Sequence, residues 1–154
     1  MLAIVFYDVV LAVHVAAVVI AFGVTFSYPI LFPFLGRNHP QALAPIHEAQ
    51  DRIGKFLITP FATVALLTGV YLAADRDYFD KIWVQVPMAI LIILLGLGGA
   101  FFSPKERRAA ELARQDPGGA EYRTVSGQIA KMGALTSVLI LVAIFFMVAK
   151  PGGY

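Results

Sequence analysis

The chain has 154 residues, of which 59% are hydrophobic and 14% are charged, and its mean hydropathy is +0.77. This apolar share exceeds that of ordinary soluble domains and excludes a conventional water-soluble globule. Because the chain contains no cysteine, it can form no disulfide, thiolate metal site or thioether haem attachment. The formal net charge of +2 is too small to indicate nucleic-acid binding. We therefore expect a lipid bilayer as its partner, and no nucleic acid.

Four long apolar segments follow one another along the sequence. About 20 residues at 1.5 Å rise cross ~30 Å of hydrocarbon, so each segment is long enough for one transmembrane helix. We predict an all-α, integral membrane four-helix bundle that forms a single domain over residues 1–154. The predicted helices cover about residues 2–35, 42–74, 80–115 and 120–149.

The first predicted helix contains His14 near its middle, where an ionisable group is costly and usually faces the bundle interior. At 100° per residue, Tyr7, Thr25 and Tyr28 share a narrow sector with this histidine, which predicts an inward polar stripe. No basic residue precedes Arg37, so we expect this segment to be retained rather than cleaved as a signal peptide.

The second predicted helix begins before its apolar segment. Apolar residues recur there at spacings of three and four, which predicts that the helix begins before the membrane and has a solvated face. These residues are Ala42, Ile46, Ala49, Ile53 and Phe56. On the opposite, solvated face we expect a ladder of His47, Asp51 and Lys55, beside an ion pair between Glu48 and Arg52.

Prolines and a turn sequence divide the rest of the chain. Pro60 and Pro87 lie inside the second and third helices, where the missing N–H can kink the helix. The third helix continues past its apolar segment as a charged amphipathic extension. The turn Asp116-Pro117-Gly118-Gly119 then separates it from the fourth helix. The second hairpin is therefore expected to project from the membrane.

Basic residues are distributed unequally between the two sides. Nine lie in the segments that join helices one to two and three to four, namely Arg37, Arg52, Lys55, Lys105, Arg107, Arg108, Arg114, Arg123 and Lys131. Three lie on the opposite side, namely Arg76, Lys81 and Lys150. The positive-inside rule predicts an inner (plasma) membrane protein with cytoplasmic helical extensions and both termini outside.

His14 is the main candidate for chemistry. It is interpreted as an axial haem ligand or a proton relay, and the alternative is a histidine that hydrogen-bonds a neighbouring helix. Counted from the predicted turn between the first two helices, His47 differs from His14 in depth by about 25 Å, so one iron cannot join them. About level with His14 on the second helix is Thr63. The iron is then five-coordinate, or is bound by Met88, Met147 or a residue of another subunit.

Basic residues toward the cytoplasmic ends are candidates to pair with haem propionates. The expected cofactor-binding set is His14, Tyr28, Arg52, Lys55 and Lys131. His47, with Glu48 and Asp51, is a second candidate metal site, and the alternative is a solvated charge ladder.

Three short motifs resemble a group of small bacterial membrane proteins. The segment from His14 to Gly23, followed by Tyr28-Pro29, is similar to the first helix of three families. These are the membrane-bound oxygen-independent protoporphyrinogen oxidase, the copper-resistance D proteins and a related family of predicted integral membrane proteins of unknown function. The oxidase's second helix is similar to Asp51–Phe56 with Thr59-Pro60 and Thr68-Gly69, and the group's ending is similar to Phe146–Pro151.

The resemblance implies a four-helix bundle and a haem or porphyrin ligand role for His14. Phe22 lies where the oxidase usually has a tryptophan, so the chain resembles the family of unknown function more than the oxidase.

We therefore expect an integral membrane protein that binds haem b through His14 and takes part in electron transfer or porphyrin redox chemistry. An alternative is a cofactor-free accessory or scaffold subunit that packs against itself or against a larger membrane complex. A further alternative is a transporter of copper or another small solute, for which four helices without intramembrane carboxylates provide little pathway unless the protein oligomerises.

Overall fold

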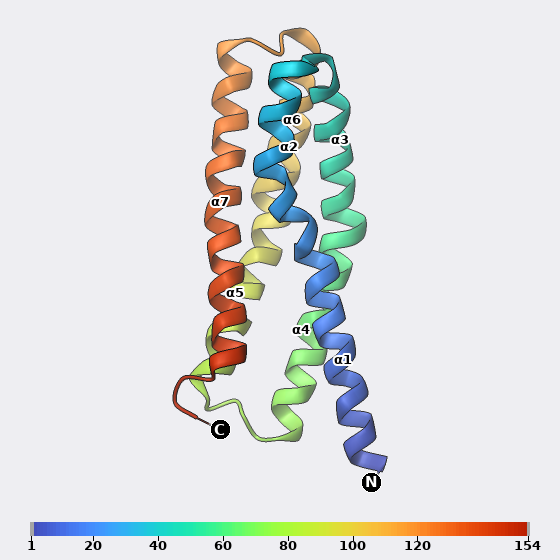
Figure 1. Cartoon of the computed structure of the whole chain (residues 1–154), viewed down its shortest axis with the longest axis vertical. Helices are drawn as coiled ribbons and strands as arrows, with labels where there is room; N and C mark the ends of the chain where they lie inside the picture. Colours follow the sequence, from blue (N-terminus) through green and yellow to red (C-terminus); the bar gives the residue numbers. More distant parts are fainter. Residues whose placement is uncertain (1, 154) are drawn as a thin grey trace.

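The computed structural model describes residues 2–153, which form four long helices that run alternately up and down (Figure 1). The first comprises α1 (Leu2–Gly23), the 3-10 turn η1 (Val24–Ser27) and α2 (Tyr28–Asn38). The second comprises the 3-10 turn η2 (Pro40–Ala42), α3 (Leu43–Ile53), the π-helical turn η3 (Gly54–Ile58) and α4 (Thr59–Asp75). The third comprises α5 (Ile82–Leu97), the π-helical turn η4 (Gly98–Phe102) and α6 (Ser103–Gln115), and the fourth is α7 (Ala120–Ala149). The predicted all-α class and the four predicted helices are confirmed.

Each long helix is long and apolar enough to cross a membrane. The four candidate spans are Val5–Asn38, Pro40–Asp75, Ile82–Gln115 and Ala120–Ala149. Large apolar side chains lie on the outside, such as Ile30, which is 76% exposed, and Val148, which is 78% exposed. Such a surface would aggregate in water but is well solvated by lipid chains, so the fold is that of a multi-pass membrane protein.

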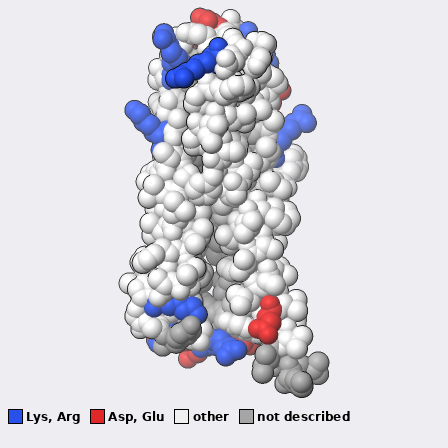
Figure 2. Space-filling model, in the orientation of Figure 1, with Lys and Arg blue, Asp and Glu red and all other residues white. Residues whose placement is uncertain are grey.

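Charged side chains gather toward the two ends of the molecule (Figure 2). In the face shown, Lys, Arg, Asp and Glu lie at the upper and lower ends and in a tier below the upper end, and the middle carries none. An uncharged middle between two charged zones is the surface expected for a bilayer-spanning bundle.

The helices pack as neighbouring pairs. α1 packs mainly on α4, α3 on α6, and α5 on α7. In Figure 1, α2, α3, α6 and α7 lie together in the upper half, whereas α1 and α4 diverge from α5 and α7 in the lower half. Figure 2 shows a hollow between the two diverging helix pairs in the lower half. Buried alanines such as Ala21 and Ala62, 0% and 1% exposed, permit close approach of α1 and α4.

Two π-helical turns interrupt the second and third long helices at matching sequences. Each begins at a glycine, Gly54 or Gly98, and ends before a hydroxyl residue and a proline, Thr59-Pro60 or Ser103-Pro104. In each turn the N–H of the hydroxyl residue donates to the carbonyl of the glycine five residues earlier. Because proline has no N–H, the regular ladder cannot continue at that point. The two turns contact each other in the bundle.

The predicted irregularity at Pro60 therefore takes the form of a π-helical turn just before it. Pro87, by contrast, lies inside an unbroken α5, so the helix is not interrupted there. The third long helix is interrupted before Pro104 instead.

The predicted apolar stripe of the second helix is only partly buried. The buried residues of α3 are Leu43, Ala44 and His47, whereas Phe56 at the end of the predicted apolar stripe is 78% exposed. In a bilayer an apolar face is solvated by lipid as well as by protein, so it can point outward while the polar face finds partners inside.

Candidate functional site

His14 lies on α1 and contacts α4. Its Nδ1 lies 2.8 Å from the carbonyl oxygen of Ala65 and 3.1 Å from Oγ1 of Thr68. A carbonyl oxygen only accepts, so Nδ1 of a neutral imidazole carries the proton and donates it to Ala65. Nε2 is then unprotonated, and it has no hydrogen-bond partner among residues 2–153. Histidines that ligate metals usually have this arrangement, with one nitrogen held by a carbonyl and the other free.

Gly69 provides the space that the imidazole occupies. A Cβ at this position would lie 3.0 Å from His14 Cε1, which is too close for ordinary contact. The Thr68-Gly69 pair therefore contacts the imidazole with both of its residues. The predicted polar stripe of Tyr7, His14, Thr25 and Tyr28 is confirmed as inward-facing, since all four are partly buried.

The level of His14 in the bundle is close to the predicted one. Its partners on α4 are Ala65 and Thr68 rather than Thr63, about half a turn to one and a half turns farther along the helix. Along the second long helix, Ala65 lies 18 residues from His47, or about 27 Å at 1.5 Å per residue. This agrees with the predicted separation of the two histidines.

The two methionines proposed as axial ligands share one neighbouring cluster. Both pack on the cluster formed by Ala73, Trp83 and Val84. Ala73 on α4 and Val84 on the antiparallel α5 lie in one cluster and are therefore about level. Thr68 precedes Ala73 by five residues, so it is level with the residue about five positions after Val84. Met88 is therefore about level with the partners of His14.

The basic residues of the predicted cofactor set do not lie near His14. Arg52 and Lys55 precede Ala65 by 13 and 10 residues on one continuous helix, which is about 20 and 15 Å. Lys55 Nζ pairs with Asp51 Oδ2 at 2.6 Å. Lys131 lines a separate groove on α7. The structure thus separates these cations from the histidine.

A different cation lies toward the other end of the same helix pair. Arg76 follows Thr68 by eight residues, about 12 Å along the helix axis. Its guanidinium carbon lies 4.5 Å from the ring centroid of Tyr7, which is on α1 with His14. Arg76 is therefore better placed than Arg52 to pair with an anionic group on a ligand of His14.

A second polar cluster joins α3, α6 and α7. His47 Nδ1 lies 2.5 Å from Glu106 Oε2, and His47 Nε2 lies 3.0 Å from the hydroxyl of Tyr122. His47 is 1% exposed, Glu106 is 2% exposed and Tyr122 is 7% exposed. The predicted solvated ladder is therefore wrong for His47, which turns inward because Glu106 and Tyr122 satisfy both of its ring nitrogens.

Aromatic rings of α2 cover this cluster. The ring of Phe32 lies 4.7 Å from that of His47, and Tyr28 packs edge-on against Phe32 at 6.2 Å. Tyr28 lies one turn before Phe32 on α2. Its hydroxyl and Oε1 of Glu106 are buried without a hydrogen-bond partner among the described residues. Tyr28 thus belongs to this cluster and not to the surroundings of His14.

The order carboxylate, imidazole, hydroxyl is that of a hydrolytic triad, but the hydroxyl here is not accessible. The cluster lies under Phe32 in the upper core, and its three side chains are buried. The arrangement can share a proton between Tyr122 and His47, and it ties three helices together. It offers no surface for a substrate.

Other predicted partners on α3 also find different neighbours. Glu48 pairs with Arg114 of α6 rather than with Arg52, so the predicted ion pair is wrong. Asp51 accepts a hydrogen bond from Ser103 at 2.6 Å in addition to its pairing with Lys55. His47, Glu48 and Asp51 thus point to separate partners, and no group of three or more His, Asp or Glu among residues 2–153 could hold a metal.

Sequence reasoning missed Glu106 and Tyr122 as partners of His47. Glu106 belongs to a charged segment that reads as solvated. It nevertheless shares one helix face with Ala109, Ala110 and Ala113, at spacings of three, four and seven, and all four are buried. A stripe of alanines that includes one acid was the sequence signal that Glu106 faces inward.

Comparisons of the chain with protein-family models, with curated proteins and with solved structures find no match. The resemblance of its short motifs to bacterial membrane families therefore stays a prediction, and function is argued from the geometry of the residues themselves.

Proposed function

We propose that this chain is an integral membrane protein that binds haem b through Nε2 of His14, and that it serves electron transfer or porphyrin redox chemistry. We also propose that it spans the inner membrane with the ends that carry α2, α3 and α6 in the cytoplasm. A bound haem would supply one-electron redox chemistry.

The observation that carries the haem proposal is the bond from His14 Nδ1 to the Ala65 carbonyl. It orients the ring and leaves Nε2 as a neutral nitrogen donor, which is the form that iron binds. Gly69 leaves room for the imidazole, and the hollow between the helix pairs lies in the same half of the bundle. Met88 is the candidate sixth ligand because it shares this level, and Arg76 is the candidate partner of a propionate.

The visible spectrum of the protein, purified in detergent after expression with added haem, tests the proposal. We expect a Soret band in the wild type and its loss in His14→Ala. His39→Ala is the matched control, because His39 is exposed in the turn before η2 and should leave the band unchanged. A wild type without a Soret band, or a band that persists in His14→Ala, would contradict haem ligation by His14.

The same experiment can identify the sixth ligand. If Met88 binds the iron, Met88→Leu should convert a six-coordinate spectrum to a five-coordinate one, and Met147→Leu should not. Unchanged spectra in both variants would assign the sixth position elsewhere or leave the iron five-coordinate.

The cofactor-free scaffold is the second candidate, and one observation favours it. The Ala65 carbonyl already satisfies Nδ1 of His14, so the residue can serve simply to join α1 and α4. This candidate predicts no chromophore, a lower unfolding temperature for His14→Ala, and a stoichiometric protein partner on purification.

A further inference from the structure

A groove lies between the third long helix and α7, away from both histidine clusters. It has a volume of about 430 Å³ and is lined by Phe101, Lys105, Gln128, Lys131, Met132 and Leu135. Residues 101 and 105 form one wall, and the helical stripe 128, 131, 132 and 135 forms the other. It is therefore a built recess between two elements and not a single exposed helix face.

One end of the groove carries two ammonium groups. Lys105 Nζ donates to Gln128 Oε1 at 2.6 Å and lies 5.8 Å from the ring centroid of Phe101. Lys131 is exposed one turn farther along α7 from Gln128. Among residues 2–153, no carboxylate forms an ion pair with either lysine. Two positive charges thus share one recess without a counter-ion from the protein.

The other end of the groove is apolar and points toward the uncharged middle of the molecule. Phe101 precedes Lys105 by one turn, and Leu135 follows Lys131 by one turn, both in the direction of the membrane centre. Leu135 is 51% exposed. The groove therefore changes from cationic to apolar along the helix axes.

We propose that this groove binds an anionic glycerophospholipid, with its phosphate between Lys105 and Lys131 and an acyl chain along Phe101, Met132 and Leu135. Basic recesses between transmembrane helices near the interface bind anionic headgroups. A soluble anion would use only the lysines, and an apolar partner would leave both charges unpaired. A phospholipid satisfies both ends at once, and this binding does not depend on haem.

Native mass spectrometry of delipidated protein in detergent, titrated with phosphatidylglycerol, tests the proposal. We expect retained one-to-one adducts in the wild type and at least about tenfold weaker binding in Lys105→Gln/Lys131→Gln. The charge-retaining pair Lys105→Arg/Lys131→Arg should bind within about threefold of the wild type, which requires only that the positive charge persists.

Matched controls separate a site from general surface charge. Arg107→Gln/Arg123→Gln removes two exposed charges from the same two helices outside the groove and should leave binding within about twofold. Phosphatidylcholine with identical acyl chains should bind at least about tenfold more weakly, since its headgroup has no net charge. Leu135→Asn should also weaken phosphatidylglycerol binding.

Four results would overturn the proposal. The first is unchanged binding in Lys105→Gln/Lys131→Gln, and the second is an equal loss of binding in Arg107→Gln/Arg123→Gln. The third is binding of phosphatidylcholine as tight as that of phosphatidylglycerol, and the fourth is displacement of the lipid by equimolar inorganic phosphate. Circular dichroism of each variant establishes that it is folded. If Lys105→Gln/Lys131→Gln does not fold, Lys105→Arg/Lys131→Arg and Leu135→Asn decide the outcome.

Discussion

The two inward-facing histidines differ in what their ring nitrogens contact. His47 uses both nitrogens within the protein, one on Glu106 and one on Tyr122. His14 uses only Nδ1, on the carbonyl of Ala65. A histidine with both nitrogens bonded is a structural element, whereas one with a free nitrogen can bind a ligand. This difference makes His14 the residue to test for function and His47 the residue to test for stability.

Removing the acid that His47 contacts should destabilise the fold. Glu106→Ala leaves a buried imidazole N–H without its acceptor, which we expect to cost about 1–3 kcal/mol of unfolding free energy. Glu111→Ala on the same helix removes a side chain that is 58% exposed, and should change stability by less than about 0.5 kcal/mol. Denaturant unfolding in detergent measures both, and equal losses would refute a special role for the buried acid.

Gly69 should tolerate no larger side chain. In Gly69→Ala the new Cβ meets His14 Cε1 at 3.0 Å, so the imidazole has to move away from Ala65. We expect about 1–3 kcal/mol of destabilisation from this overpacking, together with a weaker Soret band if haem is bound. Gly127→Ala, which meets no atom within 4 Å, should instead stabilise α7 by up to about 1 kcal/mol. Thermal unfolding distinguishes the two, and a more stable Gly69→Ala would contradict the contact.

The helices of this bundle are not regular cylinders, and their irregularities have a chemical origin. The second and third long helices each contain a π-helical turn that ends just before a hydroxyl residue and a proline. A π-helical turn inserts one residue relative to an α-helix, so it rotates the helix on one side against the other by about 100°. In the second long helix this rotation lets α3 present His47 to α6 while α4 presents Ala65 to His14.

Single-residue deletions test the role of the π-helical turn. Deleting Leu57 within η3 removes the inserted residue and should allow a continuous α-helix, with α3 and α4 retaining their faces. Deleting Val64 from the regular part of α4 shifts α3 relative to Ala65 by about 100° and should disrupt the bundle. Yield of folded protein and thermal unfolding are the readouts. Equal tolerance of both deletions would refute the proposal that the π-helical turn sets the rotation of α3 relative to α4.

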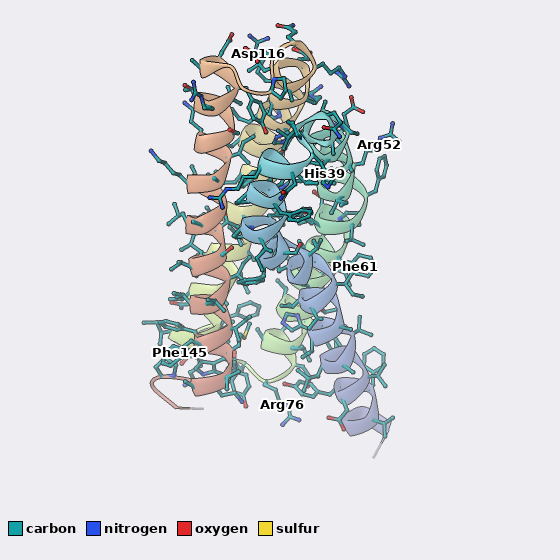
Figure 3. All side chains as sticks on the ribbon, turned by 45° about the horizontal axis from the view of Figure 1, so that its top comes forward. His39, Arg52, Phe61, Arg76, Asp116 and Phe145 are labelled. Atoms are coloured by element: carbon teal, nitrogen blue, oxygen red, sulfur yellow. The ribbon has the colours of Figure 1, made fainter. Side chains whose placement is uncertain are left out.

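At the scale of the whole molecule, charge and chain path define the same two ends. The turns at residues 39–42 and 116–119 lie at the upper end, and residues 76–81 lie at the lower end with both termini (Figure 1). In Figure 3, the labelled Asp116 lies at the upper end, Arg52 lies below it in the upper half, and Arg76 lies at the lower end. The four long helices thus each cross the uncharged zone once.

Cysteine labelling measures which end lies inside, because the native chain has no cysteine. Under the proposed orientation, Gln41→Cys and Gly118→Cys should resist a membrane-impermeant maleimide in intact cells and react after permeabilisation. Asp77→Cys, at the opposite end, should react at once. Labelling of Gln41→Cys without labelling of Gly118→Cys would contradict the four-crossing path, and reversal of all three would contradict the orientation.

The sequence by itself determined the helices and the membrane environment. Predicted and observed helix ends agree within a few residues, because hydropathy and turn chemistry are local properties of the chain. His14 could also be chosen from the sequence, since an ionisable group in an apolar span is rare.

Only the tertiary structure decided which faces meet. The bond of His14 to Ala65 joins residues 51 positions apart, and that of His47 to Glu106 joins residues 59 positions apart. In the apolar stripe of the second helix, Ala42, Ile46, Ala49 and Ile53 are partly buried and Phe56 is exposed, because lipid solvates an apolar side chain as well as the protein core does. Hydrophobicity therefore specifies that a helix crosses the membrane, and polar partners distant in sequence specify how the helix is turned.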